Sequence, residues 1–383
     1  MRWYFLVTGA MALGYGSIYT LLADLRDRFG FTETQLGLIA ASGFFAGFVA
    51  QVVLARQADR GHAPAMVRTG VAIAALAMVA SAVATEFWMF AGARLLLGLG
   101  SGMTGPAIRR LVVVRAPDDV GSNLGKQMGY DMGGFVLGPL LAAAAAEVAG
   151  IRAPFVLMAV LFGVMFLLVL RLDLHAGEAS HEQRVVRGLL RNRPLLATLC
   201  AAIAFYITIG TFETVWAVLL RDRGAETWLI GVTLSLFTVP MIFLAPYGGK
   251  TAHQRGPIRV VSLSIGTAIV CTFAYGVIPS LWVILLISLV HAVADSFTMP
   301  GNQVAVAMAA PPTQVAAALG LLGATGLATA GLVGLVAGAI YEHAGRGVLF
   351  TGTAVVMGGF LLAAMRLGRE LDQPVVAAPA VTG

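Results

Sequence analysis

The sequence predicts an all-α membrane protein in which twelve transmembrane helices form two six-helix bundles related by a pseudo-twofold axis. Two observations support this fold class. Of the 383 residues, 58% are hydrophobic and 11% are charged, whereas about a quarter of the residues in a soluble domain are charged. The second half of the chain also repeats the first, so that twelve apolar stretches divide into two sets of six.

The repeat has a constant offset of 194 residues. This shift places hydrophobic stretches on hydrophobic stretches and polar connections on polar connections, without a net insertion. It also superposes individual residues: Gly37 on Gly231, Asp59 on His253, Pro106 on Pro300 and Pro117 on Pro311. Such a repeat indicates a duplicated six-helix unit.

Each expected span is a stretch of about 18 to 25 residues with few charges, long enough to cross about 30 Å of hydrocarbon as a helix. The spans are 3–23, 34–54, 66–86, 88–112, 128–148 and 154–171 in the first half, and 195–220, 229–247, 258–278, 281–304, 317–340 and 348–366 in the second. Arg2 precedes the first span, but no small-residue cleavage site follows it. We therefore expect a membrane helix there rather than a signal peptide.

The longest connection, residues 172–194, separates an N-terminal bundle (residues 1–171) from a C-terminal bundle (residues 195–368). We expect a cytoplasmic linker there, and a disordered tail over residues 369–383, which are rich in Pro and Ala. With the N-terminus inside, 18 of the 25 Lys and Arg residues fall on the inner side, as the positive-inside rule requires. The chain is thus expected in the cell inner (cytoplasmic) membrane with both termini in the cytoplasm. The net charge of +6 follows from this topology and does not indicate nucleic-acid binding.

Two motifs point to a known family. The connection after the second span contains Asp59 and Arg60 within the run ARQADRGHAPAMVR, and the fourth span contains Arg94 within RLLLGLGSG. With these motifs the chain resembles the major facilitator superfamily over essentially its whole length. The resemblance implies two halves that rock around a central substrate site, and an inner gate at Asp59 and Arg60. His62 and Pro64 depart from the family's loop pattern, so the charge network there is expected to be partial.

The fifth span carries GGFVLGP, in which Gly134, Gly138 and Pro139 resemble the Gly-x-x-x-Gly-Pro signature of drug:proton antiporters. This resemblance implies proton-coupled export, or efflux, of a small amphipathic organic molecule or drug. Small residues four apart also let helices approach closely. Plain helix packing is therefore the alternative interpretation of the motif.

Few ionisable residues lie inside the spans, and each is a candidate for function because a charge in hydrocarbon is costly. Arg94 is expected to face the substrate cavity with Tyr15 and Tyr19, the alternative being a side chain that extends to the headgroups. Glu213 and Asp295 are the expected proton-coupling acids, because the first span has no acid at mid-membrane depth. Structural hydrogen bonds between helices are the alternative role for both acids.

The tenth span carries a polar stripe at helical spacing, formed by His291, Asp295, Thr298 and Asn302. The stripe is expected to face a cavity or another helix. We assign Thr298 and Asn302 to the substrate cavity and His291 to proton coupling, with a core hydrogen bond as the alternative for His291. Asp131, near the inner end of the fifth span, is a further coupling candidate or one half of an inner-gate ion pair.

The remaining features limit the function. Asp24, beside Arg26 at the outer end of the first span, is expected to be a solvated interfacial charge. Cys200 and Cys271 have no ligand spacing, so no metal site or cofactor is expected. No P-loop or catalytic constellation is present in the sequence, which disfavours an ATP-driven pump and an enzyme. A monomeric secondary transporter that moves small molecules and protons across the lipid bilayer is expected, with proton-coupled uptake, facilitated diffusion of a small metabolite, or a non-transporting membrane sensor as alternatives.

Overall fold

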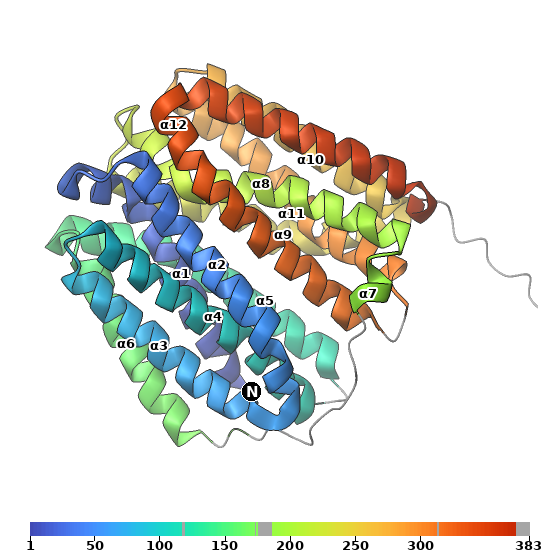
Figure 1. Cartoon of the computed structure of the whole chain (residues 1–383), viewed down its shortest axis with the longest axis horizontal. Helices are drawn as coiled ribbons and strands as arrows, with labels where there is room; N and C mark the ends of the chain where they lie inside the picture. Colours follow the sequence, from blue (N-terminus) through green and yellow to red (C-terminus); the bar gives the residue numbers. More distant parts are fainter. Residues whose placement is uncertain (117–118, 173, 175–185, 312–313, 373–383) are drawn as a thin grey trace, which may run out of the picture.

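The computed structural model describes residues 1–116, 119–172, 174, 186–311 and 314–372, and its long helices match the predicted spans (Figure 1). The N-terminal bundle contains α1 (Arg2–Phe29), α2 (Glu33–Gln57), α3 (Ala63–Val83), α4 (Phe87–Arg115), α5 (Val120–Ala149) and α6 (Ala153–Arg171). The C-terminal bundle contains α8 (Arg193–Arg221), α9 (Thr227–Arg255), α10 (Pro257–Val277), α11 (Leu281–Ala309) and α12 (Val315–Leu367). Three short elements complete the described chain: the π turn η1 (Ala58–His62), the helix α7 (Val186–Leu189) and the 3-10 turn η4 (Arg369–Asp372).

The predicted number of spans agrees with these helices. Ten helices of the described chain are long and apolar enough to cross a membrane. One of them, α12, holds both predicted spans 317–340 and 348–366, which are separated at Gly345 by non-helical backbone with φ 79° and ψ 170°. Glycine adopts this positive φ without the strain that other residues would have. The remaining predicted span, 88–112, corresponds to α4, which carries Arg94 in its first half.

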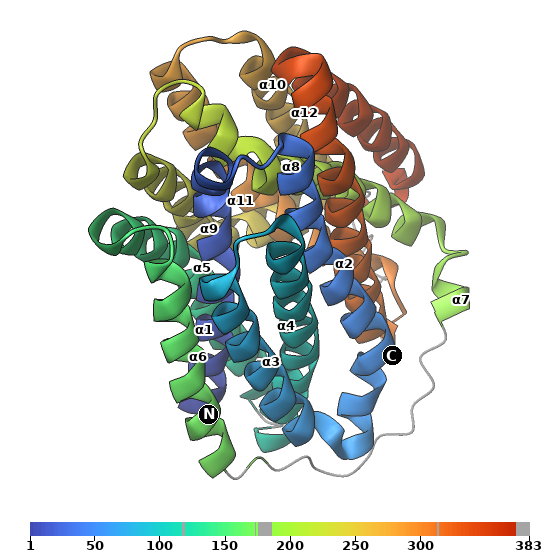
Figure 2. The same cartoon turned by 60° about the vertical axis from the view of Figure 1, so that its left-hand side comes forward.

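The two ends of the bundle are named here by the elements that lie there. The terminal face is the side at which α1 begins and α12 ends. The closed face is the opposite side, at which α1, α8 and α10 end and α2, α9 and α11 begin. Figure 2 shows the six N-terminal helices below the C-terminal bundle, with α2 running beside α12.

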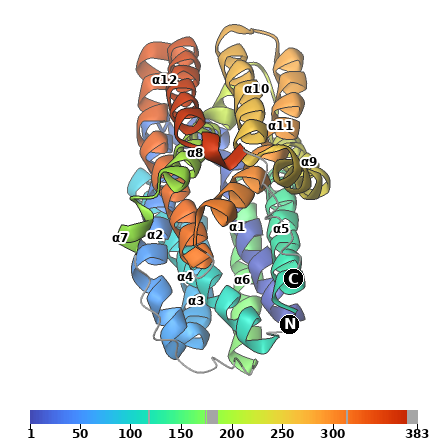
Figure 3. The same cartoon turned by 90° about the vertical axis from the view of Figure 1, so that its right-hand side faces the viewer.

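The bundles meet along two seams, α2 against α12 and α5 against α9, which lie on opposite sides of the molecule (Figure 3). A Cβ atom added to Gly37 of α2 would lie 2.6 Å from the carbonyl oxygen of Gly334 in α12. A Cβ atom added to Gly231 of α9 would lie 2.8 Å from the carbonyl oxygen of Pro139 in α5. Gly37 and Gly231 are equivalent in the repeat, and both permit close backbone approach between the bundles.

Other equivalences predicted by the repeat follow the same offset. Pro106 and Pro300 both lie inside helices, α4 and α11, whereas Pro117 lies outside the described residues. The exact limits of the two domains stay a prediction. One part of the expected tail is ordered: residues Arg369–Asp372 form η4, in which Leu371 is buried, because Asp372 accepts hydrogen bonds from the first backbone N–H groups of α10. The rest of the expected tail, residues 373–383, lies outside the described residues.

Candidate functional site

Arg94 lies in the interior of the N-terminal bundle, with a side chain that is 1% exposed. Its guanidinium donates to the carbonyl oxygen of Tyr15 at 3.3 Å and to the hydroxyl of Tyr19. The guanidinium carbon also lies 3.9 Å from the ring centre of Tyr15 and 4.6 Å from that of Tyr19. These cation-π contacts stabilise a charge that hydrocarbon cannot. Arg94 therefore lies with both tyrosines and away from the lipid-facing surface.

The C-terminal bundle contributes Glu213 to this cluster. Glu213 lies on α8 and lines one cavity together with Tyr19, within electrostatic reach of the Arg94 charge. One carboxyl oxygen, Oε2, is buried without a hydrogen-bond partner among the described residues. Arg94, Tyr19 and Glu213 therefore form a chain of polar groups that crosses from one bundle to the other in the middle of the molecule.

A cavity of about 60 Å³ adjoins this chain and contacts both bundles. Tyr19 and Glu213 line it, and so does Asp295 of α11. Most of its other lining residues are apolar or aromatic: Phe135, Pro139, Ile209, Phe212, Trp216, Leu234 and Phe237. A space of this size holds about two water molecules, so an organic substrate requires the bundles to move apart.

The polar stripe of α11 is buried, as expected, but its members face different neighbours. His291 contacts the hydroxyl of Tyr275 in α10 through Nδ1 at 3.2 Å, and its Nε2 lies 3.6 Å from Oδ2 of Asp295. Neither carboxyl oxygen of Asp295 has a hydrogen-bond partner within the described chain. Asn302 donates to the carbonyl oxygen of Thr198 in α8 at 3.1 Å. His291 and Asn302 therefore bind neighbouring helices, and of these four only Asp295 lines the cavity.

Thr298 and Asn302 do not line the cavity of this conformation, contrary to their assignment as cavity residues. The hydroxyl of Thr298 lies 3.4 Å from the carbonyl oxygen of Ala294, one turn earlier in the same helix. Helical spacing predicted correctly that the stripe shares one buried side. It could not tell which neighbouring helix lies opposite each residue.

The glycine motif of α5 packs against the first half of α1. A Cβ atom on Gly134 would overlap the carbonyl oxygen of Gly9, and one on Gly138 would overlap that of Leu13. Pro139 lies beside the central cavity. Close packing therefore accounts for the two glycines, and the same packing places Pro139 at the cavity wall.

The other predicted gate and coupling residues lie toward the terminal face. Asp59 is half-buried and Arg60 is exposed in η1, where Gly61 has φ 92°. Asp131 lies on α5 near Arg109 of α4, which exerts an electrostatic attraction on it. This neighbour favours the ion-pair interpretation of Asp131, within the N-terminal bundle.

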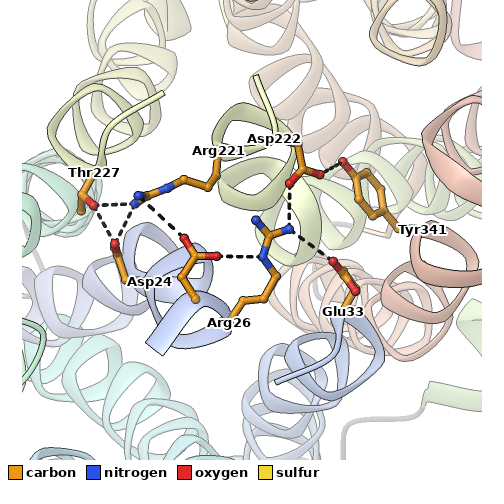
Figure 4. Close-up of polar contacts among 8 residues, drawn as sticks. Asp24, Arg26, Glu33, Arg221, Asp222, Thr227 and Tyr341 are labelled. Carbon is orange, nitrogen blue, oxygen red and sulfur yellow. Dashed lines mark hydrogen bonds and ion pairs between the residues drawn. The ribbon is translucent and has the colours of Figure 1, made fainter. Parts of the chain in front are cut away.

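At the closed face a network of charged residues joins the bundles (Figure 4). Arg221, the last residue of α8, donates to Oδ1 of Asp24 in α1 and to the hydroxyl of Thr227 in α9, both at 2.7 Å. The Thr227 hydroxyl donates to the same Asp24 oxygen at 2.8 Å. The expectation that Asp24 is a solvated interfacial charge is therefore wrong, because its partners come from a segment about 200 positions later in the chain.

Four further hydrogen bonds extend this network, which we call the closed-face network. Arg26 of α1 donates to Oδ1 of Asp222 at 2.8 Å, and Asp222 accepts a second hydrogen bond from the hydroxyl of Tyr341 (Figure 4). At the start of α2, the N–H and hydroxyl of Thr34 donate to Oε2 of Glu342 at 2.9 and 2.6 Å. These two donors hold the pKa of Glu342, which lies between the two spans of α12, below its ordinary value. All the polar contacts in the network lie at one end of the two bundles.

Comparisons with known proteins agree with this architecture. A family model described as Major Facilitator Superfamily matches residues 4–278 and 195–381. The multidrug resistance protein MdtG of Salmonella typhimurium is 23% identical over 278 residues, which cover 70% of this chain and 69% of that protein, and the same values hold for MdtG of Salmonella paratyphi A.

Solved structures show the same fold. A mutant of the nucleoside transporter NupG superposes with a TM-score of 0.81 at 15% identity, covering 96% of this chain and 98% of that one. A bacterial homologue of the human lysosomal transporter Spinster, in an inward-facing and unoccupied conformation, superposes with a TM-score of 0.80 at 16% identity, covering 97% and 96% of the two chains. Because the family model spans nearly all of the sequence and the helices adopt the matching fold, this chain belongs to the major facilitator superfamily.

Proposed function

We propose that this chain is a proton-coupled exporter of a small amphipathic organic molecule, and that it works by alternating access between its two bundles. The observation that carries the proposal is the central contact between bundles, in which Glu213 of α8 meets Tyr19 and Arg94. A titratable group at such a contact can link proton binding to the relative position of the bundles.

The orientation supports an exporter poised to take substrate from the cytoplasm. With the terminal face in the cytoplasm, 17 of the 24 Lys and Arg residues that the structure describes are on that side, in agreement with the positive-inside rule. The closed-face network then lies outside. The similar Spinster homologue was captured in an inward-facing conformation, which is the arrangement that a closed outer side implies.

Coupling follows from the charge of Glu213. When ionised, its carboxylate attracts the basic group of a substrate that enters from the cytoplasmic side. Protonation from the outer side removes that charge and releases the substrate, and loss of the proton on the cytoplasmic side restores the charge. Proton and substrate therefore use Glu213 in turn, as exchange requires. Asp295 adds a second carboxyl group to the same cavity, where an unpaired charge is costly.

The cavity lining indicates the substrate class. Phe135, Phe212, Trp216 and Phe237 offer aromatic surface, and Glu213 and Asp295 are acidic. Such a lining suits a molecule with a flat apolar body and a basic group, since aromatic faces attract cations. The distant resemblance to MdtG, whose name describes multidrug resistance, supports the same class.

The test is transport in inverted membrane vesicles under an imposed pH gradient, with a panel of fluorescent weakly basic compounds. We expect uptake into the inverted vesicles that collapses with the gradient. Glu213→Gln should abolish gradient-driven transport while counterflow, which needs no net proton movement, persists. The matched control is Glu147→Gln, which removes an exposed acid at the end of α5.

Three results would each support a different function. Movement in the opposite direction under the gradient would indicate proton-coupled uptake. Transport that ignores the gradient would indicate facilitated diffusion. A chain that moves no compound, and whose melting temperature no compound shifts, would fit a sensor instead.

A further inference from the structure

A groove of about 840 Å³ opens on the outside of the C-terminal bundle near the terminal face, away from the central cavity. Its floor is one side of α11, formed by Val290, Val293, Ala294 and Phe297 at helical spacing. Its walls are the end of α9 and the first turns of α10. The volume lies within the range of roughly 300 to 1,000 Å³ that is usual for small-ligand sites.

Close packing on both sides of α11 creates the groove. A Cβ atom on Gly248 of α9 would lie 2.8 Å from the carbonyl oxygen of Ser296, and one on Gly301 of α11 would lie 2.9 Å from the side chain of Val261 in α10. The helices α9 and α10 thus each pack on α11, and the space between their ends remains open above it.

The groove presents an apolar interior. Leu263 is 76% exposed and Val290 is 52% exposed on its surface. Two of the three hydroxyl groups that line it are satisfied by their own helix: Ser264 donates to the carbonyl oxygen of Val260 at 3.0 Å, and Thr267 to that of Leu263 at 3.1 Å. Hydrocarbon can therefore fill the groove without leaving these hydroxyl groups unpaired.

Two arginines lie at the mouth of the groove. Arg255 is the last residue of α9 and Arg259 lies in the first turn of α10, and both line the groove. The described lining contains no acidic residue. The nearby carboxylate of Asp372 accepts from the backbone N–H groups of Ile258 and Arg259 at 2.9 and 3.1 Å and so caps α10. Among the described residues, neither guanidinium group is paired with an acid.

We propose that this groove binds an anionic phospholipid, with the headgroup phosphate between Arg255 and Arg259 and one acyl chain along the floor of α11. From Arg259 to Thr267, α10 rises by about 12 Å at about 1.5 Å per residue, which is close to the depth of one leaflet of about 15 Å. Basic pockets between helices at the inner surface favour acidic headgroups. A lipid there would contact the helix whose opposite side carries His291 and Asp295, so it would also restrain α11.

The probe is purified full-length protein in detergent, titrated with phosphatidylglycerol or with zwitterionic phosphatidylethanolamine and followed by native mass spectrometry. We expect selective retention of phosphatidylglycerol. The double variant Arg255→Gln with Arg259→Gln should lose about 30-fold in apparent affinity, which corresponds to about 2 kcal/mol at about 1 kcal/mol per arginine. The matched control, Arg2→Gln with Arg171→Gln, removes two exposed charges from the same face outside the groove and should leave binding unchanged.

A second variant tests the groove itself. Val293→Trp should fill the floor and weaken phosphatidylglycerol retention while both arginines remain, with size-exclusion chromatography confirming that each variant is folded. Equal retention of the two lipids, an equal loss in the matched control, or full retention by Val293→Trp would each overturn the proposal. Stronger retention of a weakly basic transport compound than of phosphatidylglycerol would also overturn it, because the groove would then serve substrate entry.

Discussion

Replacing Arg221 by Ala should loosen the closed face. The change removes the hydrogen bonds to Asp24 and Thr227, both 2.7 Å long. It leaves the 2.8 Å bond from Thr227 to Asp24 in place, so one cross-bundle link at this point survives. The loss is therefore partial, and the protein should still fold.

The size of the effect follows from burial. The side chains of Arg221 and Asp24 are 25% and 21% exposed, so we place the pair near the upper end of the about 0.2 to 1 kcal/mol that is typical of exposed ion pairs. A loss of about 1 kcal/mol changes an equilibrium constant by about fivefold, since 1.4 kcal/mol is a factor of ten. We expect the fraction of molecules in which the bundles have separated at this face to rise about fivefold.

Double electron–electron resonance, which measures the distance between two spin labels, would detect this opening. Spin labels at Thr85, between α3 and α4, and at Ser280, between α10 and α11, lie on the exposed loops of the two bundles at this face, after Cys200 and Cys271 are replaced by Ser. The control is Arg223→Ala, because Arg223, in the turn after α8, donates to the carbonyl oxygen of Leu219 in the same bundle at 2.7 Å.

The fraction of molecules with the longer distance between labels should increase in Arg221→Ala and be unchanged in Arg223→Ala. Exchanging the charges, Asp24→Arg with Arg221→Asp, should recover much of the closed population because the pair is restored in reverse. Identical distance distributions for the two alanine variants would refute the role of the closed-face network.

Three other predictions concern separate parts of the molecule. Gly134→Ala should lower the melting temperature by an amount equivalent to about 1 to 3 kcal/mol, because the added Cβ would overlap the Gly9 carbonyl oxygen. Gly133→Ala is the control, because its added Cβ would have no neighbour within 4 Å. Equal melting temperatures for the two variants would contradict the packing argument. Arg94→Ala should abolish transport without preventing membrane insertion, and normal transport by this variant would exclude a central role for the charge. Because its closed-state pKa is lowered by Thr34, Glu342 stabilises the closed face above its ordinary pKa of about 4.3 and loses that contribution as the pH falls through the lowered value. Acidifying that face should therefore increase opening in the wild type, and a Glu342→Gln variant with the same acid response would contradict this.

The sequence predicted the residues that are unusual for their surroundings. Arg94 and Glu213 are visible in a sequence because a charge inside an apolar span is costly, and both lie in the central cluster. Tyr19 was also predicted beside Arg94 in the substrate cavity, but its position next to Glu213 depends on the packing of α1 against α8. The identity of the candidate residues was thus predictable, whereas the contacts between them depended on the fold.

The closed-face network was missed for a different reason. Asp24 and Arg221 each lie at a helix end, where charges are common and usually solvated. Nothing local distinguishes them, and their pairing joins two segments 197 residues apart. For Arg221 the repeat offers a signal, because its equivalent at the end of α1, Asp27, is also charged, whereas the equivalent of Asp24 is the apolar Val218.

That correspondence has a specific form. The offset of 194 residues makes Asp27 equivalent to Arg221, and Arg28 equivalent to Asp222. The charges are therefore inverted between the two copies. In an unaltered duplicate, like charges would occupy both positions and would repel where the ends of α1 and α8 meet beside the pseudo-twofold axis. Here Arg221 lies 3.8 Å from Oδ2 of Asp27, so two equivalent residues attract each other across that axis. The two seams use Gly37 and Gly231, positions at which both halves carry glycine, whereas closure of this face uses positions at which the halves carry opposite charges.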